Sequence, residues 1–187
     1  MRRLTRQRDV TTYDVPTAEV AHVSGAEDFE AFVLATSDRI HRAALLLCGD
    51  HHLAEDLTQT TYAKVYSHWG RVSSADSPLA YTRTVLMRTF LSHRRLRRSS
   101  EQPYDALPDV DHVGPDLVTR LDLLAALRRL RPGDRAVLVL RYWEDLSVAR
   151  TAEVLGIRET TCRTRAARAL ERLRALLPDL TDTEEPS

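Results

Sequence analysis

The sequence contains very little cysteine, which argues against a fold held together by disulfide bonds. Of its 187 residues only Cys48 and Cys162 are cysteines, and each lies within an apolar stripe. Small disulfide-stabilised proteins carry more cysteines and belong to oxidising compartments. We therefore expect a protein of the reducing cytoplasm without a disulfide framework.

Long apolar runs and the common catalytic motifs are also missing. The longest wholly apolar run is Ala43 to Cys48, far too short to cross a bilayer, and no apolar segment follows the basic first residues to make a secretory signal. The chain has no glycine-rich phosphate loop, no GxSxG element and no Cys/His nucleophile setting. These absences favour a soluble protein that is not an enzyme and needs no metal or cofactor.

The formal net charge is zero, but the charges are unevenly distributed. Residues 118–177 hold 13 arginines against 7 acidic residues, and residues 70–99 hold 7 arginines against one acid, Asp76. The acidic residues are concentrated in 26–69 and 100–117. Two basic surfaces separated by an acidic stretch favour two contacts with nucleic acid over a uniformly solvated surface.

The clearest motif is a pair of helices between Ser147 and Leu177. Ser147 is a suitable N-cap, and Gly156 ends the first helix where a left-handed residue is needed. The second helix has an apolar stripe of Cys162, Ala166, Leu170, Leu173 and Leu177, while its other face carries threonines and arginines. This pattern predicts a helix-turn-helix that binds DNA. The alternative is an ordinary helical hairpin with a solvated arginine face.

A helix predicted to begin at Pro78 also carries arginines along one side. At about 100° per residue, one half of this helix holds Leu79, Tyr81, Thr82, Val85, Leu86, Thr89, Phe90 and Leu96. The other half holds Arg83, Arg88, Arg94, Arg95 and Arg98. Such a helix repels itself unless an anion lies against it. We expect that anion to be nucleic-acid phosphate; an acidic protein partner is the alternative.

These segments predict an all-α protein made of two small helical domains. The expected order is a flexible arm (1–25), a first domain (26–98), a flexible acidic linker (99–117), a second domain (118–177) and a tail (178–187). In the first domain we expect one long helix, or two that abut near Ser37, then a helix over about His52–Trp69 and a polar loop over Gly70–Ser77. In the second, the dense apolar segment Ala136–Trp143 predicts a largely buried helix.

Taken in order, these segments resemble a bacterial RNA polymerase sigma factor of the extracytoplasmic-function group of the sigma-70 family. The first domain supplies AEDLTQTTYAKVYSHW and PLAYTRTVLMRTFLSHRRLRR, and the second supplies LRPGDRAVLVLRYWEDLSVARTAEVLGIRETTCRTRAARALERLR. The resemblance covers about residues 26–177. It implies a protein that binds core RNA polymerase and directs it to promoters. The first domain would read and melt the −10 element, and the second would read the −35 element. Many relatives also have an anti-sigma factor as partner.

The resemblance also implies roles for individual residues. Docking on core polymerase is expected of Glu55, Asp56, Gln59 and Thr60, which cover the DLxQxT signature. Contacts with −10 DNA, including its melted strand, are expected of Arg71, Ser73, Ser74, Tyr81, Arg83, Arg88, Arg94 and Arg95. Contacts with −35 double-stranded DNA are expected of Arg158, Thr160, Thr161, Arg163, Thr164, Arg165 and Arg168.

The sequence departs from the family pattern at four positions. Arg88 stands where asparagine is common, and Thr160 and Cys162 replace the usual glycine and valine. Thr151 replaces an apolar residue, and its hydroxyl is expected to bond back to the Ser147 carbonyl. These departures bear on the promoter sequence rather than on the class of protein.

Three other interpretations remain open at this point. A stand-alone helix-turn-helix regulator would act as a dimer on a palindromic site. A decoy could bind polymerase without touching DNA. A metal site can be imagined at Cys48, His51, His52, Glu55 and Asp56, but no second group of ligands completes it.

Overall fold

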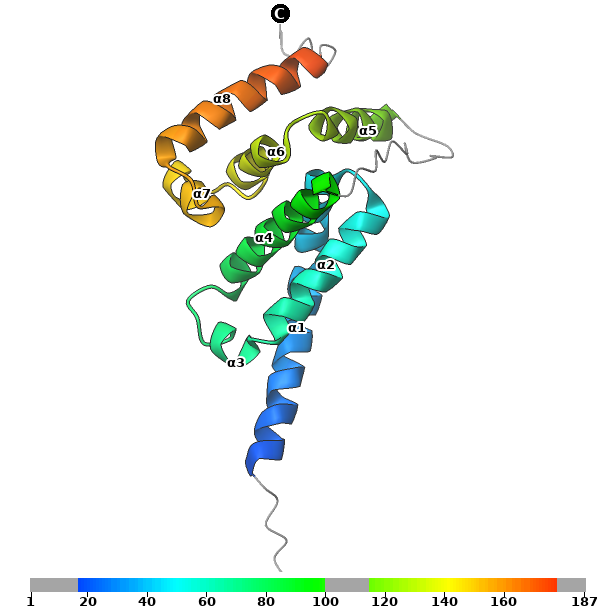
Figure 1. The fold of residues 1–187 in the computed structure, drawn as a ribbon. Helices are drawn as coiled ribbons and strands as arrows, with labels where there is room; N and C mark the ends of the chain where they lie inside the picture. Colours follow the sequence, from blue (N-terminus) through cyan, green and yellow to red (C-terminus); the bar gives the residue numbers. More distant parts are fainter. Residues whose placement is uncertain (1–16, 100–114, 178–187) are drawn as a thin grey trace, which may run out of the picture.

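The computed structural model describes residues 17–99 and 115–177, and these are helical, with no strand among them. The elements are α1 (Thr17–Cys48), α2 (His51–Tyr66), α3 (Trp69–Val72), α4 (Pro78–Ser99), α5 (Pro115–Arg128), α6 (Pro132–Leu138), the π-helical turn η1 (Val139–Trp143), α7 (Val148–Leu155) and α8 (Glu159–Leu176). In Figure 1, α5 to α8 lie above α1 to α4. The predicted all-α class is confirmed.

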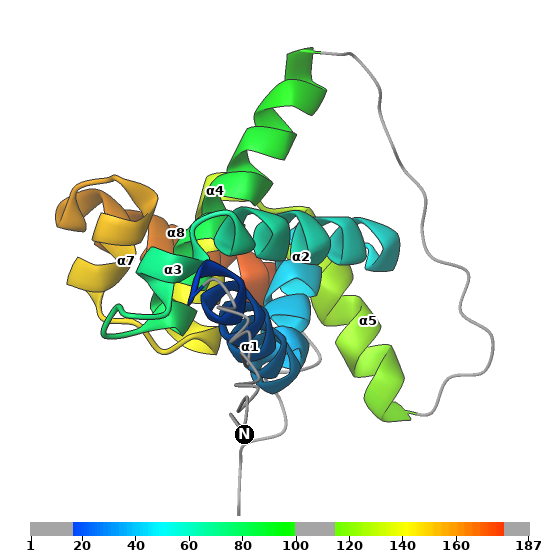
Figure 2. The ribbon, with the colours of Figure 1, turned by 90° about the horizontal axis from the view of Figure 1, so that it is seen from below.

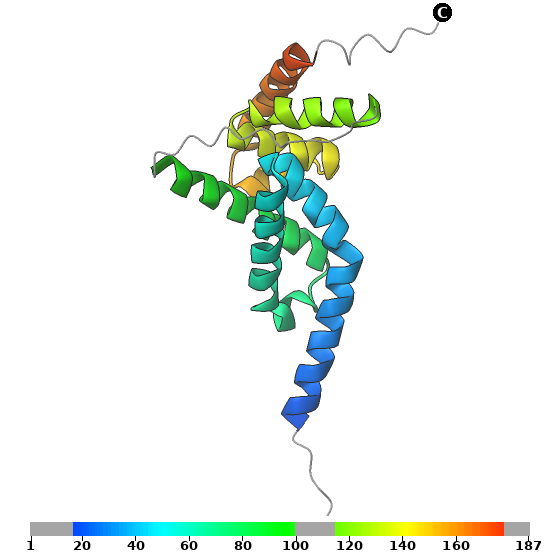
Figure 3. The same cartoon turned by 90° about the vertical axis from the view of Figure 1, so that its right-hand side faces the viewer.

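Helix α1 is one continuous helix that begins well before the expected domain boundary. It starts at Thr17, whereas the first helix was expected from residue 26, and Ser37 does not interrupt it. Its first turns project away from the other helices (Figures 1 and 3). Gly49 has a φ of 71° and ends the helix in the left-handed conformation. The expected arm up to residue 16, most of the linker and the tail lie outside the described residues.

Helix α2 buries a largely apolar face but ends earlier than the predicted helix, which ran to about Trp69. Asp50 caps it, because its Oδ1 accepts a hydrogen bond of 2.8 Å from the Leu53 amide. The helix stops at Tyr66, and the short helix α3 then carries Trp69, so the expected loop is helical up to Val72. Trp69 packs against the two phenylalanines of α1, Phe29 and Phe32, at ring-centroid distances of 5.1 and 5.0 Å. This aromatic cluster fixes α3 against α1.

The helix-turn-helix has the predicted local structure. Ser147 Oγ accepts from the Arg150 amide at 3.1 Å, and Gly156 has a φ of 63°. Cys162 and Ala166 of α8 pack against Ala152 of α7 in one buried cluster. The expectation for Thr151 was wrong: its buried hydroxyl has no hydrogen-bond partner among the described residues. The Ser147 carbonyl instead accepts the backbone amide of Thr151 at 2.9 Å.

The segment expected to be a single buried helix is divided into α6 and η1. Leu140 is fully buried, but Tyr142 and Trp143 are 56% and 45% exposed, against the prediction. The π-helical turn ends with the Glu144 amide bonded to the Val139 carbonyl at 3.0 Å. Since a π-turn holds one more residue than an α-turn, it changes which residues face the core. Glu144 is turned inward, and the two aromatic residues are left outside.

The two halves of the chain share one hydrophobic core. Met87 and Phe90 of α4 lie in the same cluster as Leu47 of α1 and as Ala136 and Leu140 of the second half, and all five are fully buried. Helices α4 and α7 are in contact and lie side by side in Figures 1 and 2. Burying a side chain such as phenylalanine or leucine is worth about 1.5–3 kcal/mol. The packing of one half on the other was not predicted from the sequence.

Candidate nucleic-acid interface

Four polar residues predicted to dock on polymerase lie together on α2. Glu55, Asp56, Gln59 and Thr60 are all exposed on its outer face, while Leu57 on the opposite side is buried. Residues three or four positions apart lie next to each other on a helix, so Glu55 and Asp56 lie one turn from Gln59 and Thr60 on the same face. The structure therefore presents them as one polar surface. None of them is needed to fill the core.

The segment that joins α3 to α4 exposes hydroxyl groups, and the first turns of α4 expose an aromatic ring. Arg71, Ser73 and Ser74 are exposed, and the Ser74 hydroxyl donates to the Arg71 carbonyl at 3.2 Å. Tyr81, in the first turns of α4, is 38% exposed, although its position suggested the apolar half. Leu96, placed in the same half, is also exposed. An exposed ring of this kind is suited to stacking with the bases of a single strand.

The arginines of α4 do not all face the same way. Arg88 and Arg95 are exposed and Arg94 is half-buried. Arg83 is different: its side chain is only 13% exposed, and its Nε lies 2.6 Å from Oε2 of Glu144. Burial lowers the pKa of Arg83, and the nearby Glu144 partly offsets this effect. In this arrangement Arg83, predicted to contact −10 DNA, is instead engaged with the second half of the protein.

Helix α8 presents most of its predicted DNA-reading residues to solvent. Arg158, Thr160, Arg163, Thr164 and Arg168 are exposed, and Thr161 and Arg165 are half-buried. Arg163 pairs with Glu159 at 2.9 Å, and Arg165 Nε lies 3.9 Å from Asp134. Arg168 has no ion-pair partner among the described residues. A basic face with so few acidic neighbours is suited to a polyanion.

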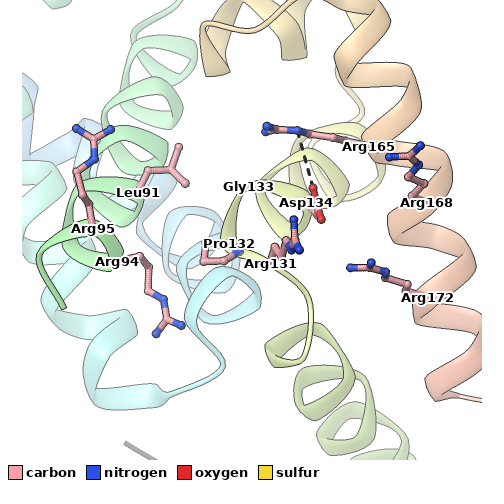
Figure 4. A pocket seen from close by; sticks show the side chains of 10 residues that line it. All are labelled: Leu91, Arg94, Arg95, Arg131, Pro132, Gly133, Asp134, Arg165, Arg168 and Arg172. Carbon is pink, nitrogen blue, oxygen red and sulfur yellow. Dashed lines mark ion pairs between the residues drawn. The ribbon is translucent and has the colours of Figure 1, made fainter. Parts of the chain in front are cut away.

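Arginines of α4 and α8 meet at a cleft of about 610 Å³ beside the start of α6. The lining residues are Leu91, Arg94, Arg95, Arg131, Pro132, Gly133, Asp134, Arg165, Arg168 and Arg172. Figure 4 shows the α8 arginines on one side and Arg94 and Arg95 on the other. Asp134 is the only acidic residue among these ten. Two lining arginines, Arg131 and Arg172, were not among the residues predicted to contact −35 DNA. No sequence pattern around Arg131 could have indicated it, because only the folding of the chain brings Arg131 close to α8.

The described residues offer no sign of a metal centre or a membrane span. Residues 17–99 and 115–177 contain no group of three histidine, cysteine or acidic residues that could hold a metal ion. Within the same ranges no helix is long and apolar enough to cross a membrane. The Cys48 thiol donates to the Asp50 carbonyl at 3.1 Å, and burial raises its pKa to about 11. Cys48 is therefore a neutral core residue.

The family models for Sigma-70 region 2 and Sigma-70 region 4 match residues 32–100 and 120–173. The ECF RNA polymerase sigma factor SigL of Mycobacterium tuberculosis is 32% identical over 176 residues, which cover 86% of this chain and 98% of that protein. The chain belongs to the extracytoplasmic-function group of the sigma-70 family.

Two further relatives support the same conclusion for this sigma factor. The RNA polymerase sigma-E factor of Streptomyces avermitilis is 36% identical over 149 residues, covering 79% of this chain and 83% of that protein. The sigma factor RpoE of Bartonella quintana, solved in complex with the anti-sigma factor NepR, has a TM-score of 0.67 at 26% identity, covering 82% of this chain and 98% of that chain. The predicted family, fold class and role in promoter-directed transcription initiation are confirmed.

Proposed function

We propose that this sigma factor docks on core RNA polymerase through α2, reads the −10 element with the α3–α4 segment and α4, and reads the −35 element with α8. The observation that carries this proposal is that α8 has one buried side and one exposed side. Cys162 and Ala166 fix one side of the helix in a buried cluster, while Arg163, Thr164 and Arg168 face outward. A helix held in this way can enter the major groove without disturbing its own core.

At the −35 element, the exposed side chains of α8 divide into two chemical types. Arginine can bond in a bidentate manner to guanine or contact a phosphate, and the threonine hydroxyls can bond to either. Phosphate contacts release counterions, so binding should weaken steeply with salt. Glu159, which pairs with Arg163, orients that guanidinium at the start of the helix.

At the −10 element, the exposed surface is suited to a melted strand rather than to a duplex. Ser73 and Ser74 can donate to phosphates or base edges, and Tyr81 can stack on a base. Extruding a base costs a few kcal/mol, which contacts with the protein must offset. Arg88 and Arg95, further along α4, are also exposed and can neutralise the phosphates.

On polymerase, Asp56 and its neighbours on α2 would make the docking contact. The chain itself would supply sequence recognition, and the polymerase would supply the chemistry of nucleotide addition. This places its work in the cytoplasm, where polymerase and chromosome are. The complex of the Bartonella relative with NepR supports an anti-sigma factor as a further partner of this chain.

In vitro transcription with purified core polymerase, followed by mapping of start sites, tests the proposal. We expect initiation at sites that share two upstream elements. Asp56→Ala should weaken co-purification with core polymerase without loss of helicity, because Asp56 is exposed. Asp122→Ala, which removes an exposed acid from α5, is the matched control and should bind normally. A chain that initiates nothing and instead binds a palindromic operator as a dimer would be a repressor.

A further inference from the structure

The cleft beside the start of α6 carries a large surplus of positive charge. Of the ten residues that line it, six are arginines and one, Asp134, is acidic. Arginine is always protonated in proteins, so the lining holds five more positive than negative charges. Four of its arginines have no ion-pair partner among the described residues: Arg95, Arg131, Arg168 and Arg172. Like charges gathered in one place repel each other, and an anion bound between them removes that repulsion.

The size and walls of this cleft are those of a small-molecule site. Helix α8 supplies three of the arginines on one side, and α4 supplies Arg94 and Arg95 on the other (Figure 4). The volume of about 610 Å³ lies within the usual range of ligand sites, roughly 300–1,000 Å³. A cleft lined by charge of one sign concentrates the electric field and raises the local concentration of counter-ions. The cleft therefore has the size and the charge that a small polyanion requires.

Arg165 is held in place at the wall of the cleft. Its Nε lies 3.9 Å from Asp134 Oδ1. Its Nη1 lies against Gly133 of α6, where an added Cβ would be 3.0 Å away, closer than ordinary van der Waals contact. A side chain that is already positioned loses less conformational freedom when it binds a ligand. At least one of the guanidinium groups is therefore pre-oriented beside the space that an anion would fill.

The cleft lies beside the outward face of α8 and is not the same surface. Each residue turns an α-helix by about 100°, so Arg165 and Arg172, seven positions apart, lie on nearly the same side. Thr164 is about 100° away from Arg165 and is exposed on the outward face that is suited to DNA. A DNA duplex, whose major groove alone is about 12 Å wide, is too large for a cleft of this volume.

The hydrogen-bonding groups of the lining favour phosphate over an acidic peptide. Guanidinium groups only donate hydrogen bonds, and Asp134 is the one lining side chain that can accept them. A peptide brings N–H donors that would find few acceptors here, whereas the oxygens of a phosphate chain only accept. Arginine and phosphate form strong, often bidentate pairs. Arg165 and Arg172 are about 10 Å apart along the axis of α8, so several linked phosphates can meet both and a single phosphate cannot.

We propose that this cleft binds a small polyphosphate, either an inorganic chain or the phosphate chain of a nucleotide. The arginines bind the phosphates. Leu91 and Pro132 form the apolar part of the lining, against which the base of a nucleotide can pack. Arg165 and Arg168 line the cleft and are also predicted to contact −35 DNA, so the ligand competes with the promoter for them. Only this competition rests on the proposed function, and the binding site itself is a property of the free chain.

Isothermal titration calorimetry of the full-length free protein tests the site, with inorganic tripolyphosphate as the first probe. At about 0.15 M salt, where exposed charges are screened beyond about 8 Å, we expect saturable binding of one molecule per chain. Arg131→Gln and Arg172→Gln should each weaken binding at least about tenfold, because each removes charged donors from the lining. Arg129→Gln is the matched control. It removes the same charge from an exposed position outside the cleft and should leave the affinity unchanged.

Adenosine triphosphate, as the second probe, separates the two sources of the phosphate chain. Tighter binding than tripolyphosphate identifies a nucleotide, and equal or weaker binding identifies an inorganic chain. The site is overturned if neither probe binds saturably, if a folded lining variant binds as tightly as the unmodified protein, or if Arg129→Gln loses as much affinity as the lining variants. Arg131 and Arg172 are both exposed, and if one variant loses helicity the other decides. The titration needs neither polymerase nor DNA, so its failure leaves the transcription assay standing, and failed transcription overturns only the proposed function.

Discussion

Replacing Arg168 with alanine should remove a single phosphate contact from the −35 interface. Arg168 is exposed on α8, one helical turn from Thr164, and has no ion-pair partner among the described residues. Its guanidinium is therefore available to DNA without first breaking another contact. Each phosphate that a protein neutralises contributes about 0.9 to the slope of log affinity against log salt. Between 50 and 200 mM salt, one contact of this kind accounts for about a 3.5-fold loss of affinity.

The assay is a fluorescence anisotropy titration of promoter duplex with assembled holoenzyme at several salt concentrations. Arg168→Ala should bind more weakly at low salt, and its affinity should fall less steeply as salt rises. Arg129→Ala is the matched control, because Arg129 is also exposed in the second half, after α5, but does not line the cleft that the α8 arginines share. Its slope should equal that of the unmodified protein.

Two outcomes would count against this reasoning. If Arg168→Ala binds with unchanged affinity and slope, then the exposed face of α8 does not meet the phosphates. If Arg129→Ala changes the slope as much as Arg168→Ala does, then DNA affinity depends on the total basic charge of the domain and not on the position of that charge on α8. Weaker binding with an unchanged slope would instead identify Arg168 as a base-reading residue, and specificity should relax at one position.

Three further predictions concern stability and the buried thiol. Phe90→Ala should destabilise the protein by about 3–5 kcal/mol in urea denaturation, because Phe90 is fully buried where the two halves meet. Gly156→Ala should cost about 1–2 kcal/mol through its φ of 63° alone, since no described atom lies within 4 Å of the added Cβ. Cys48 should react slowly with iodoacetamide at pH 8 until urea unfolds the protein. Its folded pKa of about 11 exceeds the ordinary 9.0, so its contribution to stability should be lost as pH rises through this interval, and Cys48→Ala should flatten that dependence.

The helix-turn-helix could be predicted because its determinants are local. The hydroxyl of Ser147 caps a helix that starts at the next residue, and Gly156 takes the left-handed conformation that few other residues tolerate. The apolar stripe through Cys162 follows from helical spacing alone. Each of these interactions joins residues a few positions apart, and sequence patterns describe such interactions well.

The docking of the two halves could not be predicted in the same way. A helical wheel places Arg83 among the DNA-facing arginines because it shows only the residues of its own helix. The partner of Arg83 is Glu144, which stands 61 residues later, and no local pattern in the sequence links the two. The composition of Ala136–Trp143 indicated burial throughout, yet Tyr142 and Trp143 are exposed. That outcome depends on a π-helical turn, for which the sequence holds no clear signal.

The π-helical turn also fixes how many residues the chain must have between Val139 and Glu144. One residue of an α-helix corresponds to a rotation of about 100° and a rise of 1.5 Å. Deleting one residue here would restore a regular helix, but it would swing the carboxylate of Glu144 out of reach of Arg39 and Arg83. A surface loop could lose one residue with little effect on the structure around it. Here the same loss would free the helix-turn-helix from the contacts that fix its orientation against the rest of the molecule. The orientation of the DNA-reading helix thus depends on the number of residues in this turn as well as on which residues they are.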